Sequence, residues 1–501
     1  MNLLLLASVA VPLLCGVIML CAGKRLGTKA QNALFIGSLA LGLVLTLSAL
    51  YGASGHIRLW SMTDRIYVEL AADPVSKLFG TLMSVMFLIV GIYATDYTAH
   101  DTARNRFFGC FLMVMGVLNG IYLSTNLVSM YLFYELMTLL SLPLVLHDMT
   151  GEAISAGLKY LFYSIAGAFL TLISIFMIYQ YAGSYSFTGG GVLDMSKVAG
   201  HEQALLIFTF VAVVGFGCKA GLFPLHDWLP TAHPVAPAPA SAVLSGIITK
   251  SGVVAIIRLV FYSIGADFIK GTWVQTAFIV LSLVTVFIGS MMAYLEKGIK
   301  KRFAYSTVSQ VSYVLFGLAS LNPVAACGSL MHIVFHSCIK DDLFLVAGSI
   351  IHNTGATRVD ELKGIGKRMP LTIGAFTLAA LGLVGIPPFA GFISKWYLCS
   401  GALDAGIGGL GYAGCAVLLI SALLTAGYLF PITIDGFFPG AADDKSGAGK
   451  KNPADSDDKK CDGKAAALIP IIILGLLALL MGVLPRPFIN AFTQVVADMK
   501  L

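Results

Sequence analysis

Charged residues are scarce in this 501-residue chain, and its cysteines follow no ligand pattern. Only 12% of the residues are Asp, Glu, Lys or Arg, about half the share of an ordinary soluble domain. The nine cysteines form neither a C-x-x-C nor a C-x-x-C-H motif, which argues against a structural zinc site, covalent haem or an iron–sulfur cluster held by this chain. We therefore expect no cofactor, no bound metal and no nucleic-acid partner.

Long apolar runs are present instead. They recur from Leu3 to Leu484 near the ~20-residue length that crosses a bilayer, and no stretch shows the alternation of a membrane β-barrel. The first run lacks a basic leading segment and a cleavage site, so we expect a retained helix rather than a signal peptide. The predicted fold class is an all-α polytopic membrane protein with about fourteen transmembrane helices. Their centres are expected near residues 12, 41, 85, 115, 137, 170, 212, 251, 282, 312, 340, 385, 419 and 475.

Basic residues mark alternate loops between these spans. Lysine and arginine cluster after the predicted first, third, ninth, eleventh and thirteenth spans, whereas the other loops hold few. Because such loops stay in the cytoplasm, both termini are expected outside a prokaryotic cell membrane. The longest basic loop, residues 440–464, mixes six aspartates with six lysines and has almost nothing to bury. It is predicted to be mobile, and a docking site for a soluble partner is the alternative.

Lys219, Lys250 and Glu135 are ionisable residues that fall inside predicted spans. Lys219 and Lys250 flank a proline-rich connector, at positions where a charge is costly unless it meets a partner or a water-filled cavity. The alternative is that their stems reach an interface. Glu135 is the only carboxylate of its span. It is expected either to pair with a cation, for which Lys219 is the natural candidate, or to be neutral and bonded to a neighbouring helix.

A polar stripe runs along the predicted eleventh span. His332, His336 and Lys340 lie at i, i+4 and i+8, which places them on one helix face. Histidine titrates near neutral pH, so such a stripe can pass protons. Two alternatives stay open. One is a metal site, for which no third ligand stands out, and the other is a pair of histidines satisfied by core hydrogen bonds.

Prolines interrupt two predicted spans close to a lysine. A Pro-Pro pair at 387–388 precedes Lys395, and five prolines between 224 and 239 follow Lys219. Proline removes a backbone donor and clashes with the preceding turn, and broken membrane helices are tolerated where they line a cavity. One interrupted, lysine-bearing segment in each half of the chain is typical of an inverted-repeat transporter. The halves would be spans four to eight and nine to thirteen.

Five segments together resemble the antiporter-like family of membrane subunits. Its members include proton-pumping subunits of respiratory complex I, their counterparts in membrane-bound hydrogenases and the large subunits of Mrp-type sodium/proton antiporters. The stretch PLHDWLPTAHPVAPAP is most similar to the hydrogenase-associated branch. The five segments are Tyr131 to Leu136 (YLFYEL), Lys219 to Pro234 (KAGLFPLHDWLPTAHP), Arg302 to Gln310 (RFAYSTVSQ), His332 to Gly348, and Gly385 to Lys395 (GIPPFAGFISK).

The resemblance implies two inverted five-helix repeats and a path for ions. Glu135 and Lys219 would form the charge pair of a first half-channel. Lys250 would connect it to a central relay, and Lys395 would belong to a second half-channel. The relay would consist of His332, His336 and Lys340. The implied segments are 1–106 (three N-terminal helices), 107–262 and 263–431 (the two repeats), 432–464 (a charged cytoplasmic loop) and 465–501 (the last helix).

Two aspartates depart from the family pattern. Asp341 and Asp342 follow Lys340 where members of the family usually have small or apolar residues. A pair between Asp341 and Lys340 would hold that lysine charged. His226 and His233, in the proline-rich connector, are candidate modulators of the same path.

Two functional interpretations stay open from the sequence. The chain is expected to be a non-catalytic membrane subunit of a redox-driven complex, of NADH dehydrogenase or hydrogenase type, that moves H⁺ or Na⁺ through two half-channels. The alternative is the large subunit of a stand-alone Mrp-type sodium/proton antiporter. The expected partners are other membrane subunits, redox or small antiporter subunits, and the lipid bilayer. A subunit that itself carries electrons is disfavoured, because the sequence has no cofactor motif.

Overall fold

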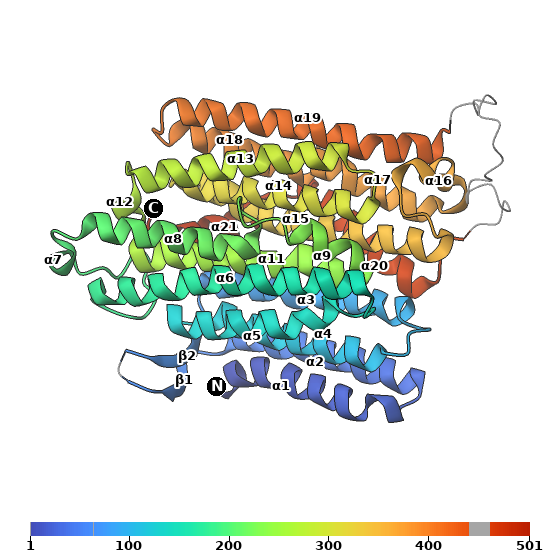
Figure 1. Ribbon diagram of the computed structural model, residues 1–501, viewed down its shortest axis with the longest axis horizontal. Coiled ribbons are helices and arrows are strands. Elements are labelled where there is room, and N and C mark those ends of the chain that lie inside the picture. The colour runs from blue at the N-terminus through green and yellow to red at the C-terminus, as the bar shows by residue number, and fades with distance from the viewer. Residues whose placement is uncertain (1, 64, 440–460) are drawn as a thin grey trace.

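The computed structural model describes residues 2–63, 65–439 and 461–501. Its long helices run side by side as a bundle, whose length lies horizontally in Figure 1. Both chain ends lie toward the end of the bundle that carries α7 (Met195–Val198) and α12 (Ala266–Ile269), and α16 (Ile365–Arg368) lies at the opposite end. Most of the predicted charged loop, residues 440–460, falls outside the described residues.

The N-terminal region consists of three long helices and a hairpin. The helices are α1 (Leu3–Ala22), followed by the short turn η1 (Gly23–Arg25), α2 (Thr28–Gly52) and α3 (Pro74–Tyr97). Between α2 and α3, β1 (His56–Ser61) pairs antiparallel with β2 (Tyr67–Ala71). The all-α prediction is wrong at this hairpin. Its second strand contains tyrosine, valine and leucine, which favour a pleated and half-buried surface, and is almost entirely buried.

Small residues let α1 and α4 (Arg104–Leu123) approach closely. An added Cβ at Gly16 would lie 2.6 Å from the backbone oxygen of Gly109, and one at Gly109 would lie 2.9 Å from the backbone oxygen of Gly16. Neither position can take a larger side chain without moving a backbone. Direct van der Waals packing of this kind is how helices associate where lipid removes the hydrophobic drive between them.

The following helices form the first half of the bundle core. They are α4, α5 (Leu127–Val145), α6 (Gly151–Tyr181), α8 (Glu202–Ala220), α9 (Leu229–Val235), α10 (Ala238–Val243), the π-helix η2 (Leu244–Ile248), α11 (Thr249–Ile257) and the π-helix η3 (Arg258–Ile264). The segment from α10 to η3 is one continuous, buried span.

The second half is built around one long central helix, α15 (Pro323–Thr354). Its 32 residues extend about 48 Å at 1.5 Å per residue, and every residue from Ala325 to Ile350 is buried. The other elements are α13 (Trp273–Leu295), α14 (Ile299–Ala319), η4 (Val359–Leu362), α17 (Pro370–Val384), α18 (Ala390–Asp404) and α19 (Gly409–Phe437), and the chain closes with α20 (Ala465–Val483) and α21 (Arg486–Met499).

Eleven helices of the described residues are long and apolar enough to cross a membrane. Helices α14, α15 and α17 are not among them. The first two carry many polar side chains, which is possible because other helices, not lipid, surround them. Each predicted span centre lies in a helix except the one near residue 385, which falls between α17 and α18.

Both predicted helix breaks are present. Helix α8 stops before Gly221, which has φ of 78°, and α17 stops before Gly385, which has φ of 87°. Glycine adopts such positive φ values without the steric penalty of other residues. Helices α9 and α18 begin beyond Pro224 and Pro388 respectively. Pro224, Pro387 and Pro388 therefore lie in non-helical connectors between two helical pieces, whereas Pro230 and Pro234 belong to α9 and Pro239 to α10.

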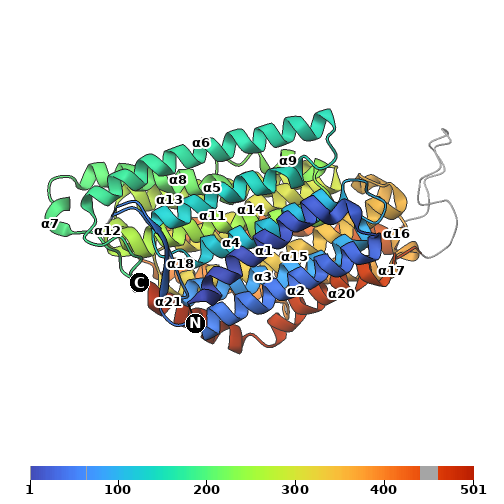
Figure 2. The same ribbon diagram turned by 90° about the horizontal axis from the view of Figure 1, so that it is seen from below.

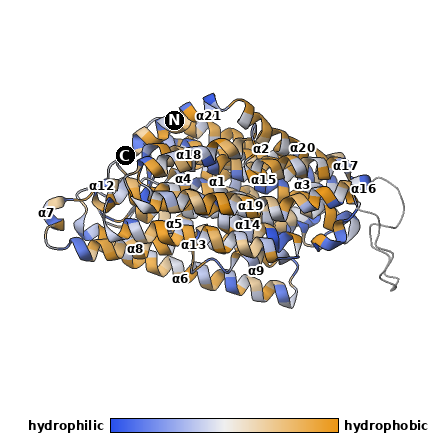
Figure 3. Ribbon diagram, turned by 90° about the horizontal axis from the view of Figure 1, so that it is seen from above, coloured by the Kyte–Doolittle hydropathy of each residue, from blue (hydrophilic) through white to orange (hydrophobic). Residues whose placement is uncertain are grey.

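Polar residues are concentrated at the two ends of the bundle. Figure 2 shows α6 along one edge and α20 along the opposite edge. The long helices are mainly orange in Figure 3, and blue segments are clear at α7 and α16. A bundle in lipid needs this distribution, because hydrocarbon cannot solvate charges.

The predicted segment edges at 106/107, 262/263 and 431/432 fall inside α4, η3 and α19.

An ion pair fastens the first half to the N-terminal region. Arg258, the first residue of η3, donates hydrogen bonds to both carboxylate oxygens of Asp73, at 2.5 and 2.8 Å. Asp73 also caps α3 by accepting a hydrogen bond from the backbone nitrogen of Ser76 (2.8 Å). The start of α3 and the end of the α10–η3 span are thereby held together.

Candidate ion-translocation site

Lys219 lies in a buried cage of hydroxyl groups, which we call the hydroxyl cage. Its ammonium donates hydrogen bonds to Thr138 (2.7 Å), Tyr160 (2.9 Å) and Ser164 (3.1 Å). These partners come from α5 and α6, inside the bundle, and Lys219 itself is fully buried. The alternative that its stem reaches an interface is therefore wrong.

Glu135 lies on α5, one turn before Thr138, and stays outside ion-pair range of Lys219. The two charges interact electrostatically. Among the described residues, however, Glu135 forms no ion pair, and its buried Oε1 has no hydrogen-bond partner. The direct charge pair that the family resemblance implied is not made in this structure, and neither is a hydrogen bond from Oε1 to a neighbouring helix.

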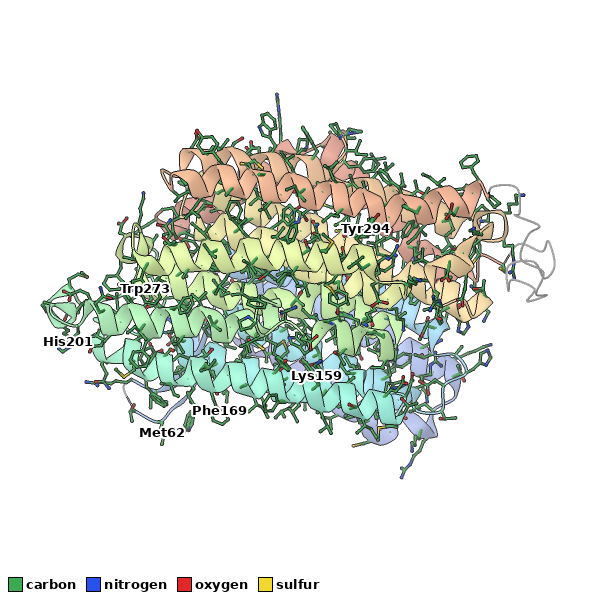
Figure 4. The ribbon with its side chains drawn as sticks, turned by 45° about the horizontal axis from the view of Figure 1, so that its top comes forward. Met62, Lys159, Phe169, His201, Trp273 and Tyr294 are labelled. Carbon is green, nitrogen blue, oxygen red and sulfur yellow. The ribbon has the colours of Figure 1, made fainter. Side chains whose placement is uncertain are left out.

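The connector after α8 folds back over the hydroxyl cage. The ring of Trp228 lies 4.8 Å from that of Tyr160. Lys159 of α6, labelled in Figure 4, pairs with Asp227 of the connector at 2.5 Å. His226 is half-buried, and its Nδ1 has no partner in the described part of the chain. The helix break thus brings polar and charged groups beside the cage.

Lys250 contacts the histidine stripe from the neighbouring helix. Its ammonium donates to the carbonyl of Ser245 (2.5 Å) and lies 2.9 Å from Nδ1 of His336 on α15. Lys250 is 1% exposed. The alternative that its stem reaches an interface is therefore wrong for this lysine too. The structure therefore brings together two residues that the sequence could place only on separate helices.

From His336 the polar side chains continue toward Lys395. The rings of His336 and His332 stack with centres 5.9 Å apart, and His332 stacks on Tyr313 of α14 at 5.5 Å. The centre of the Tyr313 ring lies 5.4 Å from the Lys395 ammonium. We call this succession of neighbours the polar series. Its members are Lys250, His336, His332, Tyr313 and Lys395.

His332 and His336 differ in how well they are satisfied. Both ring nitrogens of His332 have partners, Ser394 at 2.9 Å and Gln310 at 3.1 Å. His332 therefore agrees with the alternative of a satisfied core histidine. His336 instead has one nitrogen on Lys250, and its Nε2 is without a partner among the described residues.

Lys395 caps the end of a broken helix. Its ammonium donates to the carbonyls of Leu383 (2.7 Å) and Val384 (2.8 Å), the last two residues of α17. The last carbonyls of a helix have no partner within the helix and carry the negative end of its dipole. A cation at this point satisfies both requirements.

The side chain of Lys340 does not follow the histidine stripe that its spacing predicts. Its ammonium donates to Ser306 (2.6 Å) and to the carbonyl of Phe303 (3.2 Å), both on α14. The hydroxyl of Ser306 contacts that of Tyr428 on α19 at 2.6 Å. The predicted relay therefore divides, because the histidines face Lys250 whereas the long lysine side chain turns toward α14.

Asp341 does not pair with Lys340, contrary to the pairing considered from the sequence. Asp341 and Asp342 are both fully buried, and none of their carboxylate oxygens has a hydrogen-bond partner among the described residues. Asp341 lies instead against Gly246 of η2, where an added Cβ would meet its Oδ1 at 1.9 Å. Successive residues of an α-helix are turned by about 100°, so Lys340 and Asp341 point to different neighbours.

His233 lies beside the polar series without belonging to it. Its ring stacks on Phe344 of α15 at 4.7 Å. It is fully buried, and within the described residues neither ring nitrogen has a partner. It interacts electrostatically with Lys340 and Lys250, so its protonation would affect both lysines.

Sequence reasoning missed the neutral partners of the lysines. Tyr160 and Ser164 lie at i and i+4 on α6, and Thr138 lies at i+3 from Glu135. Helical spacing could therefore have placed these hydroxyls on inward faces. Tyr313 and Gln310 on α14 have the same i, i+3 relation. Serine, threonine and tyrosine are too common in this chain for that signal to stand out.

A metal centre finds no support among the described residues. No group of three or more His, Cys, Asp or Glu side chains there could hold a metal ion. The two stripe histidines meet Lys250, Ser394 and Gln310 instead of a third ligand.

A helical bundle of membrane-spanning length with several lysines and histidines buried along its core defines a polytopic membrane protein of the ion-transport class. Residues 124–421 match the family model described as NADH:quinone oxidoreductase/Mrp antiporter, TM. The chain belongs to this family.

Relatives from three kinds of complex are similar to the chain. NADH-quinone oxidoreductase subunit N from Desulforudis audaxviator is 32% identical over 438 residues, which cover 87% of this chain and 85% of that protein. A Na(+)/H(+) antiporter subunit from Alkalihalophilus pseudofirmus is 26% identical over 99% of this chain and 97% of that protein. Hydrogenase-4 component B from Escherichia coli is 30% identical over 66% of this chain and 50% of its own length.

Solved structures share the fold. A chain of the Mrp complex from Dietzia sp. superposes with a TM-score of 0.83 at 23% identity, covering 100% of this chain and 98% of that one. A chain of respiratory complex I from Thermus thermophilus superposes with a TM-score of 0.80 at 21% identity, covering 99% of each. The architecture is thus common to both kinds of complex.

Proposed function

We propose that this chain moves protons across a membrane as a subunit of a multisubunit, redox-driven complex. The polar series from Lys250 to Lys395 is the observation that carries the proposal. Ionisable groups inside a bilayer are costly and mark ion pathways, and here they are neighbours from one half of the bundle to the other. The hydroxyl cage around Lys219 would serve a first half-channel, and Lys395 a second.

The contact between Lys250 and His336 suggests how a proton enters the series. When the Lys250 ammonium gives its proton to Nδ1 of His336, the lysine becomes neutral and the imidazole becomes a cation. Loss of the proton on Nε2 then restores the neutral ring, so one proton moves on for each one that arrives. The Nε2 of His336, which has no partner among the described residues, is the free position at which the proton would leave the ring.

The finer architecture forms part of the proposal. Adding α14, α15 and the pair α17/α18 to the eleven candidate spans gives fourteen. We infer two inverted repeats, from α4 to η3 and from α13 to α19. Each contains one broken helix with a lysine beside the break, buried Lys219 in the first and half-buried Lys395 in the second, which supports the internal symmetry expected of such transporters.

Both termini are proposed to lie outside the cytoplasm. Under this topology Cys461, which is half-buried before α20, faces the cytoplasm. A membrane-impermeant thiol reagent should label it in inside-out vesicles and not in right-side-out ones. The Cys461→Ser variant is the matched control, since it retains the other eight cysteines. Labelling of Cys461 from the outside would overturn the topology.

The alternative function is the large subunit of a stand-alone Mrp-type antiporter. It is favoured by the similarity to the antiporter protein of Alkalihalophilus pseudofirmus over nearly the whole length of both chains. Affinity purification of the native complex separates the two proposals. A co-purifying nickel–iron or flavin subunit supports the redox-driven complex, whereas small membrane subunits alone support the antiporter.

Proton movement is tested with the purified complex in proteoliposomes that contain a pH-sensitive dye. The wild-type complex should change the internal pH, and His336→Ala should abolish the change while leaving the amount of assembled complex unaltered. His352, exposed at the end of α15, provides the control variant His352→Ala. Pumping at the wild-type rate by His336→Ala would remove the polar series from the mechanism.

A further inference from the structure

The buried carboxylate of Asp341 has no part in the pathway described so far. An isolated carboxylate in a low-dielectric interior is costly unless a cation is close or the group is neutral. Asp342, the next residue, is equally buried and also lacks hydrogen-bond partners in the described part of the chain. The two aspartates differ in what they face, and this difference separates their roles.

Asp341 and Lys250 approach the same peptide unit. The Lys250 ammonium lies 2.5 Å from the carbonyl oxygen of Ser245, because a helical side chain points back toward the N-terminus of its helix. The Asp341 carboxylate lies against Gly246, the next residue, so closely that a Cβ there would meet Oδ1 at 1.9 Å. The two groups therefore lie against neighbouring atoms of the Ser245–Gly246 peptide, without forming a direct ion pair in this structure.

The backbone at this point has a widened helical turn. Residues 244–248 form the π-helix η2, a distortion that often occurs at functional sites. The Gly246 carbonyl accepts a hydrogen bond from Ser337 of α15 (2.6 Å), which holds η2 against the helix that carries Asp341. The absent side chain of Gly246 is the space that the carboxylate occupies.

Lys250 is the cation that faces Asp341 from the neighbouring helix. The titratable groups that interact electrostatically with Asp341 are Lys250 from α11 and Cys338 and Asp342 from α15. Lys340, the adjacent lysine, is directed to α14. No charged side chain among the described residues interacts with Asp342 as Lys250 does with Asp341.

We propose that Asp341 is the counter-charge of Lys250 and positions the proton of that lysine at the entrance to the polar series. Asp341 is thus a positioning residue that acts through Lys250. The inference rests on the proposed function and adds to it a second partner for this lysine, opposite His336. An ionised Asp341 favours the charged lysine, and its removal favours transfer of the proton to the histidine.

The test compares two isosteric variants in proteoliposomes. Asp341→Asn should lower proton translocation at neutral pH about tenfold and move its pH profile toward lower pH, because the lysine then needs more acid to become charged. Asp342→Asn is the matched control, with the same burial and chemistry, and should stay within about twofold of wild type with an unmoved profile. Equal profiles for the two variants would overturn the inference.

A second pair of variants tests the contact itself. Gly246→Ala places a methyl group where the carboxylate lies and should therefore reproduce the shifted pH profile of Asp341→Asn. In an Asp341→Ala background the clash is absent, so Gly246→Ala should cause no further shift. A normal profile for Gly246→Ala alone would also overturn the inference, even if Asp341→Asn failed to assemble.

These results are separable from failure of the proposed function. A wild-type complex that moves no protons refutes the proposed function. A wild-type complex that moves protons, combined with Asp341→Asn and Asp342→Asn profiles that coincide, refutes only the role of Asp341.

Discussion

Lys219, which is buried, and Lys395, which is half-buried, each lie beside one of the two broken helices, but different chemical groups hold them. Three side-chain hydroxyls surround Lys219, whereas two backbone carbonyls at the end of α17 hold Lys395. A hydroxyl can accept or donate a hydrogen bond, and a carbonyl can only accept. The hydroxyl cage can therefore serve a charged or a neutral lysine, while the carbonyl pair fits only a donor.

The helix dipole adds to this contrast. Lys395 lies at the C-terminal end of α17, where a positive charge is favoured. Lys219 lies near the C-terminal end of its own helix α8, but its bonds are directed to α5 and α6. We infer that the site of Lys395 requires a group that donates, whereas the hydroxyls around Lys219 can either accept or donate a hydrogen bond.

Arginine replacements should give the largest difference between the two lysines. Arginine cannot lose its proton in a protein. The planar guanidinium does not fit among the three hydroxyls that hold the compact ammonium of Lys219, so Lys219→Arg should reduce proton translocation about a hundredfold or more. Lys395→Arg still donates to the two carbonyls and should keep at least about a third of the wild-type rate. The measurement is the initial rate of pH change in proteoliposomes at equal amounts of complex. Similar losses in both variants would break the distinction between the two lysine sites.

Replacing each of the two lysines by methionine tests the stability of the complex instead of its transport. Lys395→Met leaves two helix-end carbonyls without a donor, at a cost of about 1–3 kcal/mol each. Lys219→Met leaves hydroxyls that can bond one another, and Tyr160 already contacts Ser141 at 2.7 Å. The thermal unfolding midpoint of the purified complex should fall further for Lys395→Met. A larger fall for Lys219→Met would show that the hydroxyl cage depends on its cation.

Removing one hydroxyl should have an intermediate effect. Thr138→Val deletes the shortest bond to Lys219, and a hydrogen bond to a charged group contributes about 1.5–3 kcal/mol. Translocation should fall about tenfold, because the charged lysine is less stable. Thr138→Ser, which retains the hydroxyl, is the control and should be close to wild type. Equal losses in the two variants would point to packing instead of hydrogen bonding.

Glu135→Gln should have the smallest effect. The carboxylate acts on Lys219 through its field but makes no direct ion pair, so we expect a decrease of a few-fold, with assembly unchanged. Proteoliposome pumping at the unmodified rate would remove Glu135 from the mechanism. A complete loss would mean that a closed Glu135–Lys219 pair forms during the cycle.

Much of the architecture was predictable because hydrocarbon imposes strong composition rules. Runs of apolar residues located the spans, and the prolines at 224 and 387–388 located both breaks. The β1–β2 hairpin escaped prediction because its strands are short and lie between two far stronger signals.

The contacts of the polar residues were less predictable than their burial. Spacing placed His332, His336 and Lys340 on one face, but it could not show that the flexible lysine stem turns to Ser306. Nor could it show that Asp341 meets Gly246, since that contact depends on how α15 packs against η2. Whether a side chain is buried follows from the composition of its own helix. Which group it hydrogen-bonds or contacts depends on how two helices pack against each other.

The ion pair between Arg258 and Asp73 makes one part of the fold sensitive to acid. Burial raises the pKa of Asp73, but the charge and hydrogen bonds of Arg258, with those of Ser76, outweigh it and bring the pKa below the ordinary 3.8. A carboxyl with a depressed folded-state pKa contributes stability that is present above its unfolded value and is lost as pH falls through the folded one. The ion pair between η3 and the start of α3 therefore loses this stabilisation only in acid stronger than the ordinary titration range of an aspartate. Moderately acidic solution around this end of α3 leaves the ion pair intact.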